Sequence, residues 1–199
     1  EAEIIPRYEH FDRAHGTDHV RTVIAQSLAL AAHYDVDINM VYTIAAYHDT
    51  GLAYGRERHH IDAGRILAED AEVRRRFTGE QIEVMREAVE DHRASSDHAP
   101  RTVYGRIVAE ADREIDPATI IRRTVQYGLA NYPALDREGH YARCLDHLQK
   151  KYAEGGYLRL WIAESDNALR LEELRTIIRD PQQLRSLFDE TFDAETAAE

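Results

Sequence analysis

The chain reads VYTIAAYHDTG at residues 41–51, an apolar helical stretch that ends in a His-Asp pair and a glycine. Val41 and Ile44 precede His48 by seven and four residues, which places His48 on the same helix face as these apolar side chains. Asp49 follows directly, and Gly51 predicts that the helix ends at this point. We therefore expect the pair at a helix end, with His48 facing the core.

Two further polar residues are also predicted to lie on apolar helix faces. His19 precedes Val23 by four residues, and Asp112 follows Val108 by four. An ionised carboxylate that faces a core is costly unless it is paired or bound to a cation. Imidazole and carboxylate are also the ligands of metal ions that activate water. The predicted ligands of one divalent ion are His19, His48, Asp49 and Asp112. The alternative is that each is an isolated buried polar group with its own hydrogen-bond partner.

Length and composition limit the classes of protein to consider. The chain has 199 residues, 43% of them hydrophobic, which predicts one soluble globular domain. The net charge of −12 argues against duplex nucleic acid as a partner, although local arginines could still bind a small phosphorylated substrate. The single cysteine, Cys144, excludes an internal disulfide and suits the cytoplasm, and its helical spacing predicts burial. No apolar stretch is long enough to span a bilayer, so no membrane partner is expected.

The pattern of apolar residues predicts an all-α protein. Asp18, Asp37 and Thr78 are expected to cap helices over residues 18–34, 37–48 and 79–92. Further helices are predicted over residues 59–69, from Pro100 to 112, 136–153 and 165–178, and after the Asp-Pro pairs 116–117 and 180–181. Arg74-Arg75-Arg76 is predicted to be a basic helix end. Residues 157–162 are the one segment compatible with an extended piece.

Three segments carry a resemblance to a known family: DHVRTV at residues 18–23, AYHDTG at 46–51 and VAEADR at 108–113. Their order on successive helices resembles the HD-domain superfamily of metal-dependent phosphohydrolases. The resemblance covers about residues 15–115. It implies an HD-domain-like helical bundle with additional C-terminal helices. We expect one domain over residues 1–199, in which residues 15–115 hold the metal site and residues 116–199 flank it.

The histidines between the His-Asp pair and the last Asp have a role implied by the same resemblance. Relatives use such residues for a second metal or for substrate phosphate. The candidates here are His59 or His60, whose register leaves both open, and His92, at a predicted helix end. A chance position in a solvated loop is the alternative for His92.

The function implied by the resemblance is metal-dependent hydrolysis of a nucleotide or another small phosphorylated metabolite by metal-activated water. Asp49 is expected to bind the metal and position the water, and His59 or His60 and His92 to protonate the leaving group or contact the phosphate. The residues expected to bind the substrate's anionic end are Arg56, Arg58 and Arg93. The donors suit Mn, Fe, Co, Ni, Zn or Mg, and do not select among them.

The chain lacks features that are typical of several kinds of HD-domain relative. No Gly-Tyr-Pro stretch follows the histidines, which argues against cyclic-di-GMP hydrolysis, and 199 residues leave no room for an attached nucleotide synthetase. The chain resembles the small stand-alone bacterial HD hydrolases. The alternative function is a regulatory module that binds a metal or nucleotide without turnover. The sequence indicates no oligomeric state.

Overall fold

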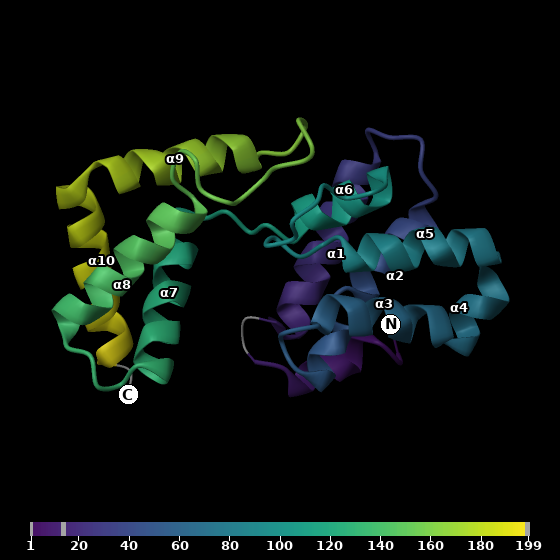
Figure 1. Ribbon diagram of the computed structural model, residues 1–199, viewed down its shortest axis with the longest axis horizontal. Helices are drawn as coiled ribbons and strands as arrows, with labels where there is room; N and C mark the ends of the chain where they lie inside the picture. Colours follow the sequence, from purple (N-terminus) through teal and green to yellow (C-terminus); the bar gives the residue numbers. More distant parts are fainter. Residues whose placement is uncertain (1, 13–14, 198–199) are drawn as a thin grey trace. The chain divides into compact units, whose positions relative to one another are not determined.

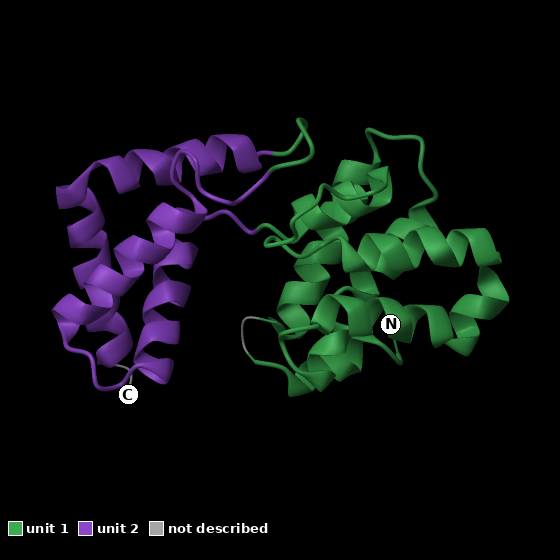
Figure 2. Ribbon diagram, viewed as in Figure 1, with its two compact units in different colours: residues 1–113, 160–165 green, residues 114–159, 166–199 purple. Residues whose placement is uncertain are grey.

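The computed structural model describes residues 2–12 and 15–197, and these contain helices and no β-strand (Figure 1). The all-α prediction is therefore confirmed. The chain forms two compact units, shown in separate colours in Figure 2. Unit 1 comprises residues 1–113 and 160–165, and unit 2 comprises residues 114–159 and 166–199. None of the described helices is both long enough and apolar enough to cross a membrane.

Unit 1 contains six α-helices and two short 3-10 helices among its described residues. In chain order these are η1 (Ile5–His10), α1 (Thr17–Ala31), α2 (Ile38–Tyr47), η3 (Thr50–Tyr54), α3 (His59–Glu69), α4 (Ala71–Arg76), α5 (Gly79–Glu90) and α6 (Val103–Ala111). The predicted basic helix end, Arg74 to Arg76, forms the last turn of α4. The two 3-10 helices have no counterpart in the expected pattern.

Local hydrogen bonds explain several of the helix starts. Asp37 accepts from the backbone N–H of Asn39 at 2.8 Å and caps α2 as predicted. Thr78 and Gln81 form the predicted capping box of α5. These two starts could be read from the sequence because each bond joins residues two or three positions apart.

Two predicted starts are wrong. Helix α1 begins at Thr17 with Gly16 at its N-cap, so Asp18 lies inside the first turn and not before it. Helix α6 begins at Val103, because Thr102 accepts from the N–H of Gly105 and starts the helix after Pro100. In both places the observed start lies within three positions of the predicted one, because local sequence signals do not specify a helix end to the residue.

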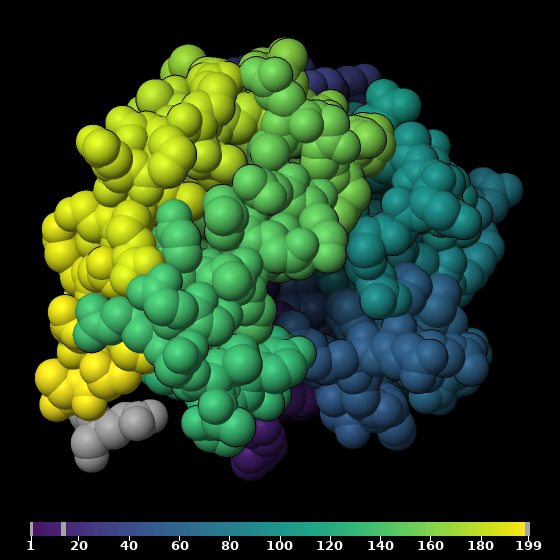
Figure 3. Space-filling view, turned by 60° about the vertical axis from the view of Figure 1, so that its left-hand side comes forward, coloured from purple at the N-terminus to yellow at the C-terminus, as the bar shows by residue number. Residues whose placement is uncertain are grey.

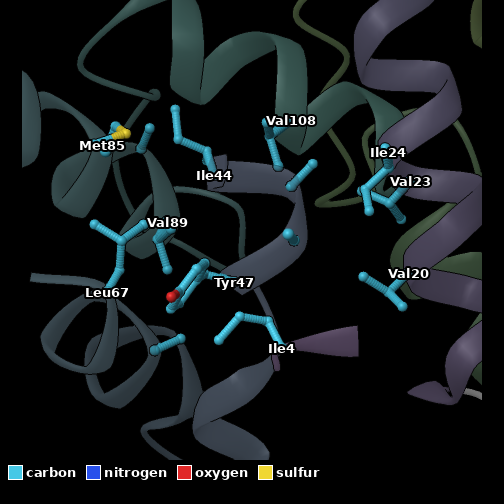
Figure 4. Close-up of a cluster of buried hydrophobic side chains, with 14 of the residues drawn as sticks. Ile4, Val20, Val23, Ile24, Ile44, Tyr47, Leu67, Met85, Val89 and Val108 are labelled. Atoms are coloured by element: carbon cyan, nitrogen blue, oxygen red, sulfur yellow. The ribbon is translucent and has the colours of Figure 1, made fainter. Parts of the chain in front are cut away.

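The core of unit 1 is formed where α2 packs against α1, α5 and α6. Ile44, Leu67, Met85 and Val108 are fully buried, and Figure 4 shows their side chains with those of the neighbouring helices. Each such side chain contributes about 1.5–3 kcal/mol by leaving water. This apolar layer holds the ends of α2, α5 and α6, where the polar residues of interest lie.

The segment at residues 160–165 returns to unit 1. Ile162 is buried beside Val41 and Ile107, and the backbone N–H of Trp161 donates to Glu110 Oε2 at 2.6 Å. Glu110 is therefore a buried carboxylate with a structural partner. No strand is formed over residues 157–162, so an extended piece there is not a sheet strand.

The described residues of unit 2, which end at residue 197, form four helices: α7 (Pro117–Asn131), α8 (Arg137–Lys151), α9 (Asn167–Arg179) and α10 (Pro181–Thr196). The side chains of Asp116 and Asp180 cap α7 and α10, as the Asp-Pro pairs predict. Cys144 is buried on α8, and burial raises the pKa of its thiol to about 11. The space-filling view in Figure 3 shows side chains of unit 2, in green to yellow, closing the gaps visible between its ribbons.

Candidate metal centre

Helix ends in unit 1 bring the four predicted ligands together. His19 lies in the first turn of α1, His48 is the C-cap of α2, Asp49 follows it, and Asp112 is the C-cap of α6. His19 Nε2 lies 3.3 Å from His48 Nε2 and 3.2 Å from Asp112 Oδ1. Asp49 Oδ2 lies 3.2 Å from His48 Nε2. We name His19, His48, Asp49 and Asp112 the first donor group.

A second donor group shares Asp49 with the first and adds His59 and His92. His59 Nε2 lies 3.3 Å from His92 Nε2. Asp49 Oδ1 lies 3.4 Å from His92 Nε2 and 3.6 Å from His59 Nε2. The two oxygens of Asp49 thus face different groups, Oδ2 the first and Oδ1 the second. Each group includes three residues whose donor atoms lie within 4.8 Å of one another.

The orientation of three imidazoles is set by backbone carbonyls. Nδ1 of His48 donates to Ala45 O at 2.8 Å, and Nδ1 of His92 donates to Val89 O at 2.6 Å. Nδ1 of His59 donates to the Arg56 carbonyl at 2.8 Å. Because a carbonyl only accepts, the proton must be on Nδ1, which leaves the Nε2 lone pair free in the neutral ring.

The donor atoms fit a bound cation. In each group two Nε2 atoms face each other at 3.3 Å, with carboxylate oxygens beside them. Two lone pairs at this separation repel unless a proton or a metal ion lies between them. Oriented imidazoles whose second nitrogen is held by a carbonyl are also the usual arrangement around a bound metal. The residues therefore suit divalent metal ions.

Burial and charge act in opposite directions on these groups. Burial opposes ionisation of Asp49, but the surrounding His48, His19 and His92 hold the pKa of its carboxyl well below the usual range. Burial also opposes protonation of His19, but Asp112 and Asp49 raise its imidazole pKa to about 10. The metal-free site therefore holds ionised carboxylates and a protonated imidazole, and binding of a metal ion would release that proton.

The structure separates His59 from His60, which the sequence left open. His59 lies in the second donor group, whereas His60 lines a neighbouring pocket of about 420 Å³. The buried His60 Nδ1 makes no hydrogen bond within the part of the chain that the structure describes. Arg93, Ser95 and Ser96 also line this pocket.

The three predicted substrate-binding arginines have different surroundings. Arg56 is exposed and lies 3.2 Å from Asp12 Oδ2, with Nη2 3.4 Å from His15 Nε2. Arg93 Nη1 donates to the Glu57 carbonyl at 2.8 Å. Arg58 is exposed and makes no side-chain hydrogen bond or ion pair with any residue that the structure describes. None of the three belongs to either donor group.

The sequence interpretation missed two residues that position the site. The Tyr8 hydroxyl is buried, donates to Ala46 O at 3.0 Å and accepts from the N–H of Asp49 at 3.2 Å. Gly51 packs so closely on α3 that a Cβ there would lie 2.0 Å from the His59 carbonyl oxygen. The glycine next to the His-Asp pair could have suggested a close approach, but nothing in the sequence connects Tyr8 with residues about 40 positions away.

Residues 16–115 match the family model of the HD domain. No curated protein matches the chain, and no solved structure does. The match covers half of the chain and agrees with the segment at residues 15–115 that carries the resemblance. The chain therefore belongs to the HD-domain superfamily of metal-dependent phosphohydrolases.

Proposed function

We propose that this HD-domain protein hydrolyses a phosphate ester or anhydride of a nucleotide or another small phosphorylated metabolite. The observation that carries the proposal is the position of Asp49, whose two oxygens face separate groups of imidazoles at 3.2–3.6 Å. A buried carboxylate shared in this way can join two divalent ions. Paired ions are a recurrent arrangement in enzymes that cleave phosphate esters.

The chain's own residues supply the metal ligands. The first donor group would hold one ion, and Asp49, His59 and His92 would hold a second. A bound divalent ion supplies Lewis acidity, which lowers the pKa of water and offsets negative charge on a phosphoryl oxygen. Nitrogen and oxygen donors suit Mn, Fe, Co, Ni, Zn and Mg.

Partly exposed side chains at the edge of the site leave a path by which a substrate could approach. The Asp112 side chain keeps 22% of its surface exposed and His59 keeps 15%, whereas His48 is fully buried. A phosphate would therefore approach past Asp112 and His59. Arg58, which has no described partner, is a cation available for the anionic end of the substrate.

The pocket beside the second donor group would receive another part of the substrate. His60 and Arg93 line this pocket, and each directly follows a member of the second donor group in the chain. Its walls also include the hydroxyls of Ser95 and Ser96. Hydrogen-bonding walls of this kind suit the polar portion of a small metabolite better than an apolar tail.

The proposal is tested by phosphate release from a panel of nucleotides and phosphomonoesters, with protein first stripped and then reloaded with each candidate metal. We expect turnover only with metal. Asp49→Ala is expected to abolish it, because this change removes a donor from both groups. His92→Ala is expected to weaken turnover while the first ion still binds. Full activity of metal-free protein or of Asp49→Ala would disprove this mechanism. If metal-loaded protein cleaved nothing in a broad panel, a binding module without turnover would become the better conclusion.

A further inference from the structure

His59 differs from the other oriented imidazoles in where its carbonyl partner lies. The partners of His48 and His92, Ala45 and Val89, lie inside α2 and α5, where helix hydrogen bonds fix the backbone. The partner of His59 is Arg56 O, in the loop at residues 55–58 between η3 and α3. The direction of His59 Nε2 therefore depends on the position of a loop.

This loop has few internal restraints. It begins at Gly55, which has a φ of 108°, and Arg58 at the N-cap of α3 makes no side-chain capping bond. Without a cap, the first turn of α3 gains no stabilisation from the loop side chains. Contacts made by the loop with other elements must then fix the Arg56 carbonyl.

Two arginines make such contacts. The Arg56 side chain reaches Asp12 and His15, at 3.2 Å and 3.4 Å. Arg93, directly after His92, donates to the carbonyl of Glu57 at 2.8 Å. We name Arg56 and Arg93 the arginine clasp. The clasp holds the loop at two consecutive residues, 56 and 57. Arg93 directly follows His92 after the end of α5.

We infer that the arginine clasp sets the affinity of the second donor group for its metal ion by holding His59 in position. The inference rests on the metal centre of the proposed function and assigns its regulation to residues that are not ligands. The imidazoles of the first donor group come from α1 and the end of α2, and neither donates to a carbonyl of this loop. Outer partners of metal ligands commonly change metal affinity by roughly 10–100-fold.

The test uses the full chain, stripped of metal by a chelator and titrated with Mn²⁺ alone. Calorimetry measures the two affinities, and electron paramagnetic resonance detects the magnetic coupling between two Mn²⁺ ions in one site. The variant that releases the clasp is Arg56→Gln with Arg93→Gln. The matched control is Arg58→Gln, in the same loop, because the exposed Arg58 side chain makes no hydrogen bond or ion pair with a described residue. Removal of the ligand itself, in His59→Ala, marks complete loss of the second ion.

We expect wild-type protein to bind two Mn²⁺ ions. The clasp variant should bind the first ion unchanged and the second roughly tenfold or more weakly, with loss of the coupled signal at low Mn²⁺. Arg58→Gln should bind both ions as wild type does, and Arg56→Lys with Arg93→Lys should retain part of the affinity that the clasp variant loses. Circular dichroism establishes that the variant remains folded.

Four results would overturn the inference: one ion only in wild-type protein, unchanged affinity in the clasp variant, equal weakening of both ions, or the same loss in Arg58→Gln. All measurements are made without substrate. Two-ion binding controlled by the clasp in a protein that hydrolyses nothing would therefore refute the proposed function and leave this inference standing.

Discussion

Replacing Asp49 by Asn is expected to abolish the stabilisation that Mn²⁺ gives to the folded protein. Asp49 Oδ2 is 3.2 Å from His48 Nε2, and Oδ1 is 3.4 Å from His92 Nε2, so one carboxylate serves both donor groups. Asn keeps the volume of the side chain but loses its charge and one of its two donor oxygens. Asp112→Asn removes a carboxylate from the first group alone, because Asp112 Oδ1 contacts His19 and His48.

The size of the effect follows from the number of ions that each variant can hold. One ion at a hundred times its Kd stabilises the fold by about 2.7 kcal/mol, so two independent ions contribute about 5 kcal/mol. For a chain of 199 residues, each kcal/mol raises Tm by about 2–4 °C, which gives roughly 10–20 °C for wild-type protein. Asp112→Asn should retain roughly half of this rise, and Asp49→Asn less than about 2 °C.

The assay is thermal unfolding followed by circular dichroism, with chelator-stripped protein before and after addition of Mn²⁺. The shift is taken within each variant, so that changes in metal-free stability cancel. Asp18→Asn is the control, because Asp18 is an exposed acid beside His19 whose side chain is outside both donor groups. A normal rise of Tm in Asp49→Asn would refute a shared carboxylate, and so would complete loss of the rise in Asp112→Asn.

Three further outcomes are expected. Gly51→Ala should destabilise the protein by about 1–3 kcal/mol in chemical denaturation, because a Cβ would lie 2.0 Å from the His59 carbonyl oxygen, whereas Gly79→Ala, with open space around it, should cost nothing. The Cys144 thiol should react with a disulfide reagent only after unfolding, because it is buried and burial raises its pKa to about 11; rapid reaction in native buffer would contradict this. Burial opposes ionisation of Asp70, but the Tyr47 hydroxyl and two backbone N–H groups lower the pKa of its carboxyl below 3.8. The ionised carboxylate therefore stabilises the fold above pH 3.8, and this stabilisation is lost as pH falls through the lowered pKa. In Asp70→Asn, the free energy of unfolding should therefore fall less between pH 5 and about pH 2 than it does in the wild-type protein. An unchanged dependence of the unfolding free energy on pH would refute this role of Asp70.

The features that the sequence predicted well depend on residues close together in the chain. Asp37 and Thr78 cap α2 and α5 through bonds to residues two or three positions later. The family resemblance, which the match over residues 16–115 bears out, also comes from short segments on successive helices. The start of α1 was misplaced because Gly16 and Asp18 both lie where a helix could begin, and local signals do not choose between them.

The sequence by itself identified the candidate donors, which are a His-Asp pair at the end of an apolar helix, with His19 and Asp112 on other helices at core-facing spacings. It could not choose His59 over His60, because neighbouring residues on a helix differ only by a rotation about its axis. The packing of α3 against α5 sets that rotation and brings His59 to His92. The same packing brings His59 and His92 to Asp49 Oδ1 and lets Arg93 reach the Glu57 carbonyl. Helical periodicity specifies which face a residue occupies, but only contacts between helices decide which faces meet.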